Sequence, residues 1–347
     1  MPFQKERKWT MKLKTMIVGL TASAALILGM PLNGEASDMK YSVKANIPEN
    51  QVDKTKTYFD LRVKPGAVQT ISLTLQNNAA EEAVIEVEPN RATTNRNGVI
   101  NYGKSIDKKD KTLKADFEEM VSKKQEVVLK PNEEKQVKFT LTMPKEAFKG
   151  TVLGGFYVHK KESDKEAKQE KDVQIKNDYS YIIGVKLTES DEKVEPNLQL
   201  GQVKPGLQNY HTIVSANLEN TAATIISGMT VESKVYKKGK TKVLHEAKVE
   251  NQMMAPNSNY DLPISWNDQV LEPGKYTLEL KAQDMDGHKW KFTKDFEIRN
   301  HDKKYNDEAV GLEEGNDLVQ NSVVAALFTV LIALLIFAFE RYRRKRQ

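Results

Sequence analysis

The 347-residue chain is predicted to be mainly β, with two immunoglobulin-like antiparallel β-sandwich domains followed by a single C-terminal transmembrane helix. Three observations carry this prediction. Short runs of alternating apolar and polar residues recur through the middle of the chain, and the same turn sequence precedes such a run in both halves. The chain also ends in a long uncharged apolar run that basic residues follow at once.

The alternating runs predict strands, because successive side chains of a strand point to opposite faces of a sheet. In one run, Ile71, Leu73 and Leu75 alternate with polar residues. The same period recurs in Val137 to Met143, Tyr181 to Leu187, Met229 to Val235, Tyr276 to Leu280, and Trp290 to Ile298. Many short strands of this kind, separated by Gly, Pro and Asn turns, are typical of antiparallel sandwiches.

One arrangement occurs in both halves of the chain. Lys64-Pro65-Gly66 precedes a strand that ends in Leu75-Gln76-Asn77, and Lys204-Pro205-Gly206 precedes one that ends in Leu218-Glu219-Asn220. Pro fixes φ and Gly permits positive φ, so each triplet predicts a tight turn that opens a strand. We therefore predict one sandwich in each half; the alternative is chance recurrence of a common turn.

A helix from about Lys111 to Ser122 is expected within the first sandwich, with Asp110 as its N-cap. Four apolar residues fall on one face of it: Leu113, Phe117, Met120 and Val121. The preceding segment, Arg91 to Asp110, is polar and long for a connection. Long loops on a rigid scaffold are where binding surfaces tend to lie.

A charged run lies near the expected boundary between the two sandwiches. Residues Lys160 to Asp172 are nearly all charged and predict an exposed hairpin tip. The flanking strands are then the last two of the first sandwich, which gives domains at 38–190 and 191–302. A split inside the charged run is the competing choice, so the boundary is left open between 165 and 196.

The two ends of the chain predict export and anchoring. Residues 1–36 have the basic start, apolar middle and small terminal residues of a cleavable signal peptide; an uncleaved second span is the alternative. Residues 318–339 predict the transmembrane helix, since Val323 to Phe339 alone spans roughly 26 Å as a helix. A buried core helix is the competing interpretation. Residues 303–317 form a polar stalk, and the basic tail, 340–347, is expected in the cytoplasm.

This topology places the predicted sandwiches outside the cell, at the cell membrane with a single pass. Of the formal net charge of +5, the leader contributes +3 and the tail +4, so the exported part carries −2. It therefore has no basic surplus for nucleic acid. The chain has no cysteine and no Asn-x-Ser/Thr acceptor, which together favour a bacterial surface protein.

The sequence offers little chemistry. The five histidines are scattered without metal-ligand spacing, and nucleophile elbows and phosphate-binding loops are missing from the sequence. Asp284 to Gly287 resembles the start of a calcium loop, but a plain hairpin turn is favoured. Trp266 and Trp290 are expected in a core rather than stacked on sugars, and Gly154-Gly155 is expected to mark a bulge or close backbone approach. No catalytic, cofactor or metal residues are predicted, and the binding residues are unknown.

In its order of motifs, the chain resembles the WxL-interacting cell-surface proteins of Gram-positive bacteria. In the first half the resemblance rests on Phe59-Asp60-Leu61 with Lys64-Pro65-Gly66, Ala92-Thr93-Thr94-Asn95 with Asn97-Gly98, and Pro144 with Gly154-Gly155-Phe156. In the second half it rests on Tyr181 to Leu187, Pro196-Asn197-Leu198 with Val203-Lys204-Pro205-Gly206, and Leu218-Glu219-Asn220. The resemblance implies a peptidoglycan-binding first module and a second module that binds WxL-domain surface proteins and host matrix proteins.

The expected function is therefore that of a membrane-anchored extracellular binding and scaffold protein of the cell wall, active in adhesion and not as an enzyme. Two alternatives stay open. An extracytoplasmic sensor subunit would need a membrane partner, because the tail is too short to carry an output domain. A wall-acting enzyme would need two converging carboxylates across a groove.

Overall fold

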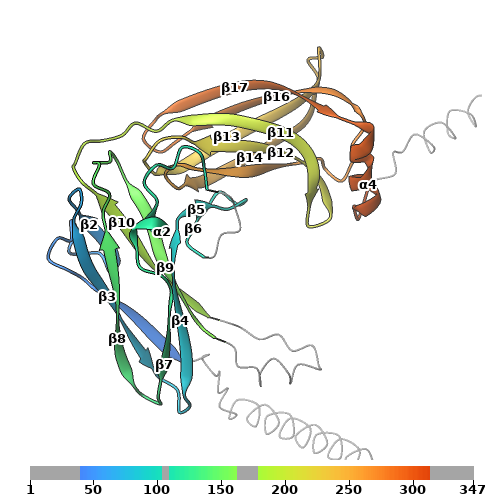
Figure 1. Ribbon diagram of the computed structural model, residues 1–347. Coiled ribbons are helices and arrows are strands. Elements are labelled where there is room, and N and C mark those ends of the chain that lie inside the picture. The colour runs from blue at the N-terminus through green and yellow to red at the C-terminus, as the bar shows by residue number, and fades with distance from the viewer. Residues whose placement is uncertain (1–39, 104–108, 162–178, 313–347) are drawn as a thin grey trace, which may run out of the picture. The chain divides into compact units, whose positions relative to one another are not determined.

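Figure 1 shows the computed structural model, which describes residues 40–103, 109–161 and 179–312. The described residues from Tyr41 onward belong to one compact unit. The predicted signal peptide, the transmembrane segment and the basic tail lie outside the described residues. Among the residues that are described, no helix is long and apolar enough to cross a bilayer.

Two sheets form a sandwich in the first half of the chain. One sheet has the strand order β1 (Tyr41–Asn46), β3 (Val68–Asn77) and β8 (Glu134–Thr142). The other has the order β2 (Phe59–Arg62), β10 (Ser180–Thr188), β9 (Val152–Lys160), β4 (Ala83–Arg91) and β7 (Gln125–Leu129). All pairs are antiparallel except β2 and β10, which are parallel. Phe156 lies at the centre of the core, with its ring centroid 4.5 Å from Phe139, 6.1 Å from Phe117 and 6.3 Å from Phe59.

A second sandwich follows with its own core. Its three-stranded sheet has the order β11 (Leu198–Gln208), β12 (His211–Asn220) and β15 (Ser258–Ser265). Its four-stranded sheet has the order β14 (Val243–Met254), β13 (Ile226–Lys237), β16 (Gly274–Gln283) and β17 (Lys289–Ile298). Seven antiparallel strands divided in this way make an immunoglobulin-like arrangement. Tyr276 lies in the core between Trp266 and Phe296, with ring centroids 5.6 and 5.5 Å away.

The predicted alternation is present in the strands. In β8, Val137, Phe139 and Leu141 are buried while the residues between them are exposed. Trp266 is buried in the second core, and Trp290 is half-buried and packs against it, so both tryptophans lie where the sequence placed them. The core position follows from the pleat, which sends alternate side chains to opposite faces.

The repeated strand ending has the same structural role in both sandwiches. Asn77 and Asn220, the last residues of β3 and β12, are fully buried. The Asn77 amide donates to the carbonyls of Glu81, Leu129 and Lys130, and its oxygen accepts from Ala79 N. Asn220 donates to the carbonyls of Thr224 and Ala255 and accepts from Ala222 N. Each asparagine therefore hydrogen-bonds the turn that leaves its strand and the end of a second strand, β7 or β14.

The second Lys-Pro-Gly triplet departs from the prediction. Gly66 lies in a turn with φ +67°, as expected. Lys204-Pro205-Gly206, in contrast, lies inside β11, where Pro205 pairs with Val214 of β12. A proline is tolerated there because β11 is an edge strand and the missing N–H breaks no ladder bond on its open side. The turn after β11 is formed instead by Asn209 and Tyr210, both with positive φ.

The predicted helix is shorter than expected. Only Phe117–Met120 are helical (α2), and the N-cap is Asp116, whose carboxylate accepts from Glu118 N, rather than Asp110. Asp110 accepts from the backbone N and hydroxyl of Thr112, which forms a separate turn. The helix ends after Met120 because Val121 forms a β-bridge with Leu141. Leu113 and Val121 therefore matched the helical spacing without being helical.

Gly154-Gly155 allows two close approaches to β9. A Cβ on Gly154 would lie 2.1 Å from the Phe117 ring in the core. A Cβ on Gly155 would lie 2.9 Å from the ring of Tyr102, on the other face of the strand. The glycine pair therefore allows two aromatic rings to pack against opposite faces of one strand. The strand pairs without a bulge at these residues, so the closest approach is by side-chain rings rather than by a bulge or another backbone.

Short elements complete the two sandwiches. After β4, the chain forms a small hairpin of β5 (Thr93–Thr94) and β6 (Ile100–Asn101). After β17, it forms a 3-10 turn, Asn300–Lys303, and the short helix α4 (Lys304–Glu308). Asn306 donates to Leu271 O and accepts from Leu271 N, so the start of the predicted stalk is bound to the second sandwich.

Candidate functional site

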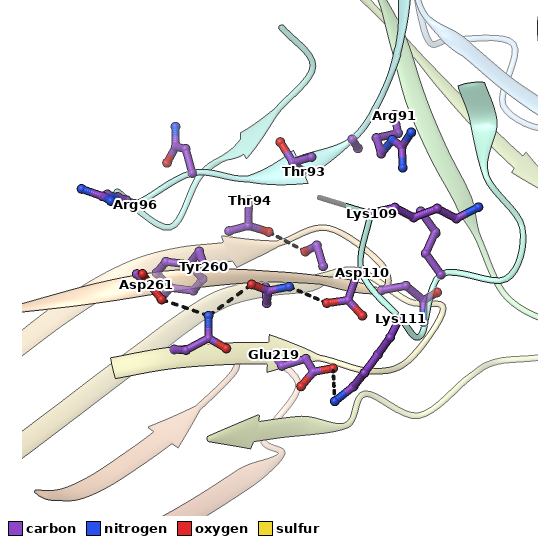
Figure 2. A pocket seen from close by; sticks show the side chains of 17 residues that line it. Arg91, Thr93, Thr94, Arg96, Lys109, Asp110, Lys111, Glu219, Tyr260 and Asp261 are labelled. Atoms are coloured by element: carbon purple, nitrogen blue, oxygen red, sulfur yellow. Dashed lines mark hydrogen bonds and ion pairs between the residues drawn. The ribbon is translucent and has the colours of Figure 1, made fainter. Parts of the chain in front are cut away.

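A polar cleft of about 690 Å³ lies where the two sandwiches meet. One wall comes from the loop after β4 in the first sandwich, residues 91–96 and 109–113. The other wall comes from β12, at Asn217 and Glu219, and from residues 257–261 at the start of β15. Figure 2 shows the two walls, with hydrogen bonds and an ion pair between them.

A buried hydroxyl network joins the walls at the base of the cleft. Thr94 and Ser258 are 2% and 5% exposed, and their hydroxyl oxygens lie 2.7 Å apart. Thr94 Oγ1 also accepts from Ala255 N at 3.0 Å, and Ser258 Oγ donates to Ala255 O at 2.8 Å. Buried hydroxyls are costly unless they are paired, so this network fixes β5 against the second sandwich.

The turn beyond β5 adds a further backbone contact. Gly98 has φ +66°, and its carbonyl accepts from Met253 N at 2.7 Å. A Cβ on Gly98 would lie 1.7 Å from the side-chain oxygen of Gln252, so only glycine fits without moving that side chain. Asn95 shapes the same turn by accepting from Asn97 N and Val99 N. The turn and its contacts with the second sandwich therefore explain the residue types of the Ala92-to-Gly98 segment.

Two of the basic residues at the cleft form ion pairs with acidic side chains. Arg91 contacts Asp116 at 3.0 Å and Glu118 at 2.5 Å. Lys109 contacts Asp116 at 3.3 Å and Glu119 at 2.7 Å. Burial alone would raise the pKa of Glu118, but hydrogen bonds from the Arg91 side chain and backbone hold it below its ordinary value. Hydrogen bonds to Glu118 and Glu119 raise the pKa values of Arg91 and Lys109, respectively. These ions hold α2 to β4 rather than facing a ligand.

The second wall carries a row of amide and carboxylate groups. Asn217 donates to Asn259 Oδ1 at 3.1 Å and to Asp261 Oδ1 at 3.0 Å. Asn259 in turn donates across the cleft to Asp110 Oδ2 at 2.5 Å. Lys111 reaches Glu219 at 3.7 Å from the opposite wall. Fixed donors and acceptors of this kind suit a ligand rich in hydroxyl and amide groups.

Arg96 is the cation left available to a ligand. It is exposed at the mouth of the cleft, and among the described residues it has no ion-pair partner. A guanidinium can bind a carboxylate or phosphate through two parallel hydrogen bonds. Among the described residues, the cleft therefore presents one cation without an acidic partner beside a row of amide and carboxylate groups.

The carboxylates of the cleft each have a partner of their own. Asp110 is bound by Asn259, Glu219 is paired with Lys111, and Asp261 is held by Asn217 and by Lys204 at 3.4 Å. Each carboxylate is bound to its own partner. Glycoside hydrolysis, in contrast, requires two carboxyl groups that face each other across the scissile bond. Within the described parts of the chain, no group of three potential metal ligands is present. This geometry favours binding.

Sequence reasoning found one wall of the cleft and missed the other. The predicted binding loop, Arg91 to Asp110, supplies the first wall, although residues 104–108 lie outside the described residues. Asn217, Asn259 and Asp261 carried no signal, because single polar residues in alternating strands do not show which strands become neighbours. The predicted hairpin at Asp284 to Gly287 is a turn, with Gly287 at φ +93°. His288 next to it lies between Asp284 and Glu195, at 2.7 and 2.9 Å.

Several solved structures match the chain at low sequence identity and with low TM-scores. The Escherichia coli chaperone DraB is 15% identical, with 75% of this chain and 97% of that chain covered and a TM-score of 0.28. The chaperone YadV is 10% identical, with 74% and 100% covered and a TM-score of 0.29. A PapD-like domain of human CEP192 is 11% identical, with 44% and 87% covered and a TM-score of 0.25. No curated protein sequence matches the chain.

Two family models match the chain, one for each half. The model described as WxL Interacting Protein, peptidoglycan binding domain, matches residues 41–160. The model described as WxL Interacting Protein, host binding domain, matches residues 170–307. Together they account for most of the chain, and the cleft draws its walls from both matched regions. The chain therefore belongs to the WxL Interacting Protein family.

Proposed function

We propose that the chain is a membrane-anchored extracellular scaffold protein of the Gram-positive cell wall, which binds peptidoglycan, WxL-domain surface proteins and host matrix proteins. The observation that carries this proposal is the pair of binding-domain matches, residues 41–160 and 170–307. The predicted signal peptide and the apolar run at 318–339 with its basic tail support an outside location with one membrane span.

The cleft between the sandwiches is the proposed site for peptidoglycan. Peptidoglycan combines N-acetylated sugars with short peptides that end in carboxylates. Asn217, Asn259 and Asp261 offer donors and acceptors to hydroxyl and acetamide groups, and Arg96 offers a cation to a carboxylate. A polar cleft of this kind gains affinity from several matched hydrogen bonds rather than from apolar burial.

The test is co-sedimentation of the purified full chain with insoluble peptidoglycan. We expect the chain to be retained, and Arg96→Ala to weaken binding roughly tenfold, the usual effect of losing one charge-assisted hydrogen bond. Arg299→Ala is the matched control, because Arg299 is an exposed arginine that does not line the cleft. Retention no better than that of an unrelated sandwich protein would show that the chain is not a peptidoglycan binder.

Binding of WxL-domain proteins and host proteins is assigned to the second sandwich, residues 191–302. Its support is the match of residues 170–307 to the host-binding model. Cross-linking on intact cells, followed by identification of the captured proteins, tests this part. Capture of WxL-domain or matrix proteins by the full chain, and not by a variant lacking the second sandwich, is the expected result.

A further inference from the structure

The end of the second sandwich that lies away from the cleft is built from three turns and the C-terminal segment 299–312. Val310 N donates to Tyr210 O at 2.9 Å, and His211 contacts Asp268 at 2.7 Å. Lys237 contacts Glu272 at 3.6 Å, in the turn that also carries Leu271, the partner of Asn306. The C-terminal segment 299–312 therefore contacts the turns at 209–210 and 266–273, and the 266–273 turn also contacts the β13–β14 hairpin. In Figure 1, the hairpin of β11 and β12 ends beside α4.

Tyr210 stands at the tip of this end in an unfavourable backbone conformation. It is 67% exposed and has φ +64°, in the two-residue turn Asn209-Tyr210. Turns of this type strongly prefer glycine at the second position, and a bulky residue with positive φ is strained there. Exposed Val310 and Val270 lie in the adjoining turns. The fold therefore presents an aromatic ring to the surroundings at an energetic cost.

The neighbouring hairpin is basic. Between β13 and β14 the chain reads Lys237-Lys238-Gly239-Lys240-Thr241-Lys242. Lys237 and Lys238 are paired with Glu272 and Asp295, but Lys240 and Lys242 are exposed and have no acidic partner among the described residues. Lys303 and Lys304 equal the acidic residues of α4, Asp307 and Glu308, in number, and Glu313, Glu314 and Asp317 follow in the sequence before the predicted span. An exposed tyrosine and unpaired lysines at the same end of a domain suit the headgroup layer of an anionic bilayer.

The length of chain beyond Val310 limits how far this end can lie from a membrane. The predicted span begins at Leu318, eight residues on, and eight residues reach at most roughly 28 Å. We propose that this end of the second sandwich rests on the anionic bilayer that holds the anchor, with Tyr210 in the headgroup layer and Lys240 and Lys242 at lipid phosphates. This inference rests on the anchoring that is part of the proposed function.

Docking of this end would set the height of the cleft. Glu219 in the cleft and His211 beside the tip lie on the same strand, β12, eight residues apart. At the rise of an extended strand this is roughly 27 Å. The bilayer would then act as a platform that holds the cleft at a fixed distance above the membrane.

The absence of cysteine from the sequence permits a clean test with single labelled sites. The full chain is labelled with an environment-sensitive fluorophore at Asn209→Cys, beside Tyr210, or at Met285→Cys, an exposed turn at the cleft end of the same sandwich. Both are placed in vesicles of phosphatidylcholine with phosphatidylglycerol that carry a spin-labelled quencher lipid. We expect quenching at position 209 and little at position 285.

Two further variants separate this contact from mere proximity. Tyr210→Gly removes the ring and relieves the turn, so the hairpin is kept while quenching at position 209 falls. Lys240→Ala with Lys242→Ala lowers the ratio of docked to undocked chain roughly fivefold per lysine, because each basic residue near an anionic surface is worth about 1 kcal/mol. The lysine effect should vanish in vesicles of phosphatidylcholine alone.

Flotation of the same vesicles tests the membrane anchor separately from the docking of the second sandwich. If the full chain does not float with the vesicles, the anchor is wrong and this inference falls with it. If the chain floats but position 209 is quenched no more than position 285, the docking is wrong while the anchor stands.

Discussion

At the scale of single residues, Gly154 shows how one missing side chain shapes the first core. The Phe117 ring occupies the space that a Cβ at position 154 would need, at a separation of 2.1 Å. Gly154→Ala is therefore expected to destabilise the fold by about 1–3 kcal/mol, the usual cost of overpacking a core. Urea unfolding measures this change.

Gly206→Ala is the matched control for that measurement. A Cβ at Gly206 meets nothing within 4 Å, and Gly206 has no positive φ. The control should change the free energy of unfolding by no more than about 0.5 kcal/mol. Equal effects of the two substitutions would contradict the packing of Phe117 against β9.

His245 gives a prediction for acid stability. It is buried, and its ring stacks on Trp266 with a centroid separation of 3.8 Å. Burial lowers the pKa of His245 from 6.5 to about 4. Between these values the unfolded chain binds a proton that the folded chain does not, so the free energy of unfolding falls as the pH falls from 6.5 toward 4.

His245→Phe should remove this part of the acid dependence while keeping an aromatic ring on Trp266. The measurement is urea unfolding of both proteins between pH 7 and 4, with exposed His301→Gln as the control. Parallel pH profiles for the parent chain and His245→Phe would show that His245 is not kept neutral by burial.

At the scale of elements, the strands were predictable and the helix was not. In β3, β8, β16 and β17 one face is buried, and the sequence shows this as alternating apolar and polar residues. The predicted helix failed because four residues at helical spacing included Val121, which pairs with Leu141 instead. Local periodicity over so few residues does not exclude a β-bridge to a distant strand.

The cleft was only half predictable for a related reason. The loop after β4 is long and polar within one stretch of sequence, and such a loop can be recognised. The second wall combines Asn217 of β12 with Asn259 and Asp261 of β15. These residues meet because β12 and β15 are paired in register, with Asn217 opposite Asp261. Sequence periodicity does not specify which strands become neighbours.

Strand β10 gives a prediction about where the first sandwich ends. The host-binding model begins at residue 170, before β10, yet β10 lies between β2 and β9 in the sheet of the first sandwich. A chain of residues 38–192 should unfold cooperatively. A chain of residues 38–165 lacks β10, leaves β2 without its neighbouring strand and one edge of β9 open, and should be poorly folded or aggregated. Thermal unfolding compares them, and equal cooperativity would place the boundary inside the charged run.

At the scale of the whole molecule, the proposed function combines the cleft, the family match and a location outside the membrane. The hydroxyl network of Thr94 and Ser258 and the hydrogen bond between Asn259 and Asp110 hold residues of both sandwiches around one cleft. The two matched regions fit family models described as a peptidoglycan binding domain and a host binding domain. Binding at the wall requires that both lie outside the membrane, and this location is the part of the proposal on which the others depend.

Accessibility of single cysteines on wall-stripped cells tests that location most directly. Met285→Cys marks the second sandwich and Gln347→Cys marks the basic tail, in a chain that otherwise has no cysteine. A membrane-impermeant maleimide added to intact cells is expected to label position 285 at once and position 347 only after lysis. Labelling of position 347 before lysis, with position 285 protected, would contradict the proposed surface location.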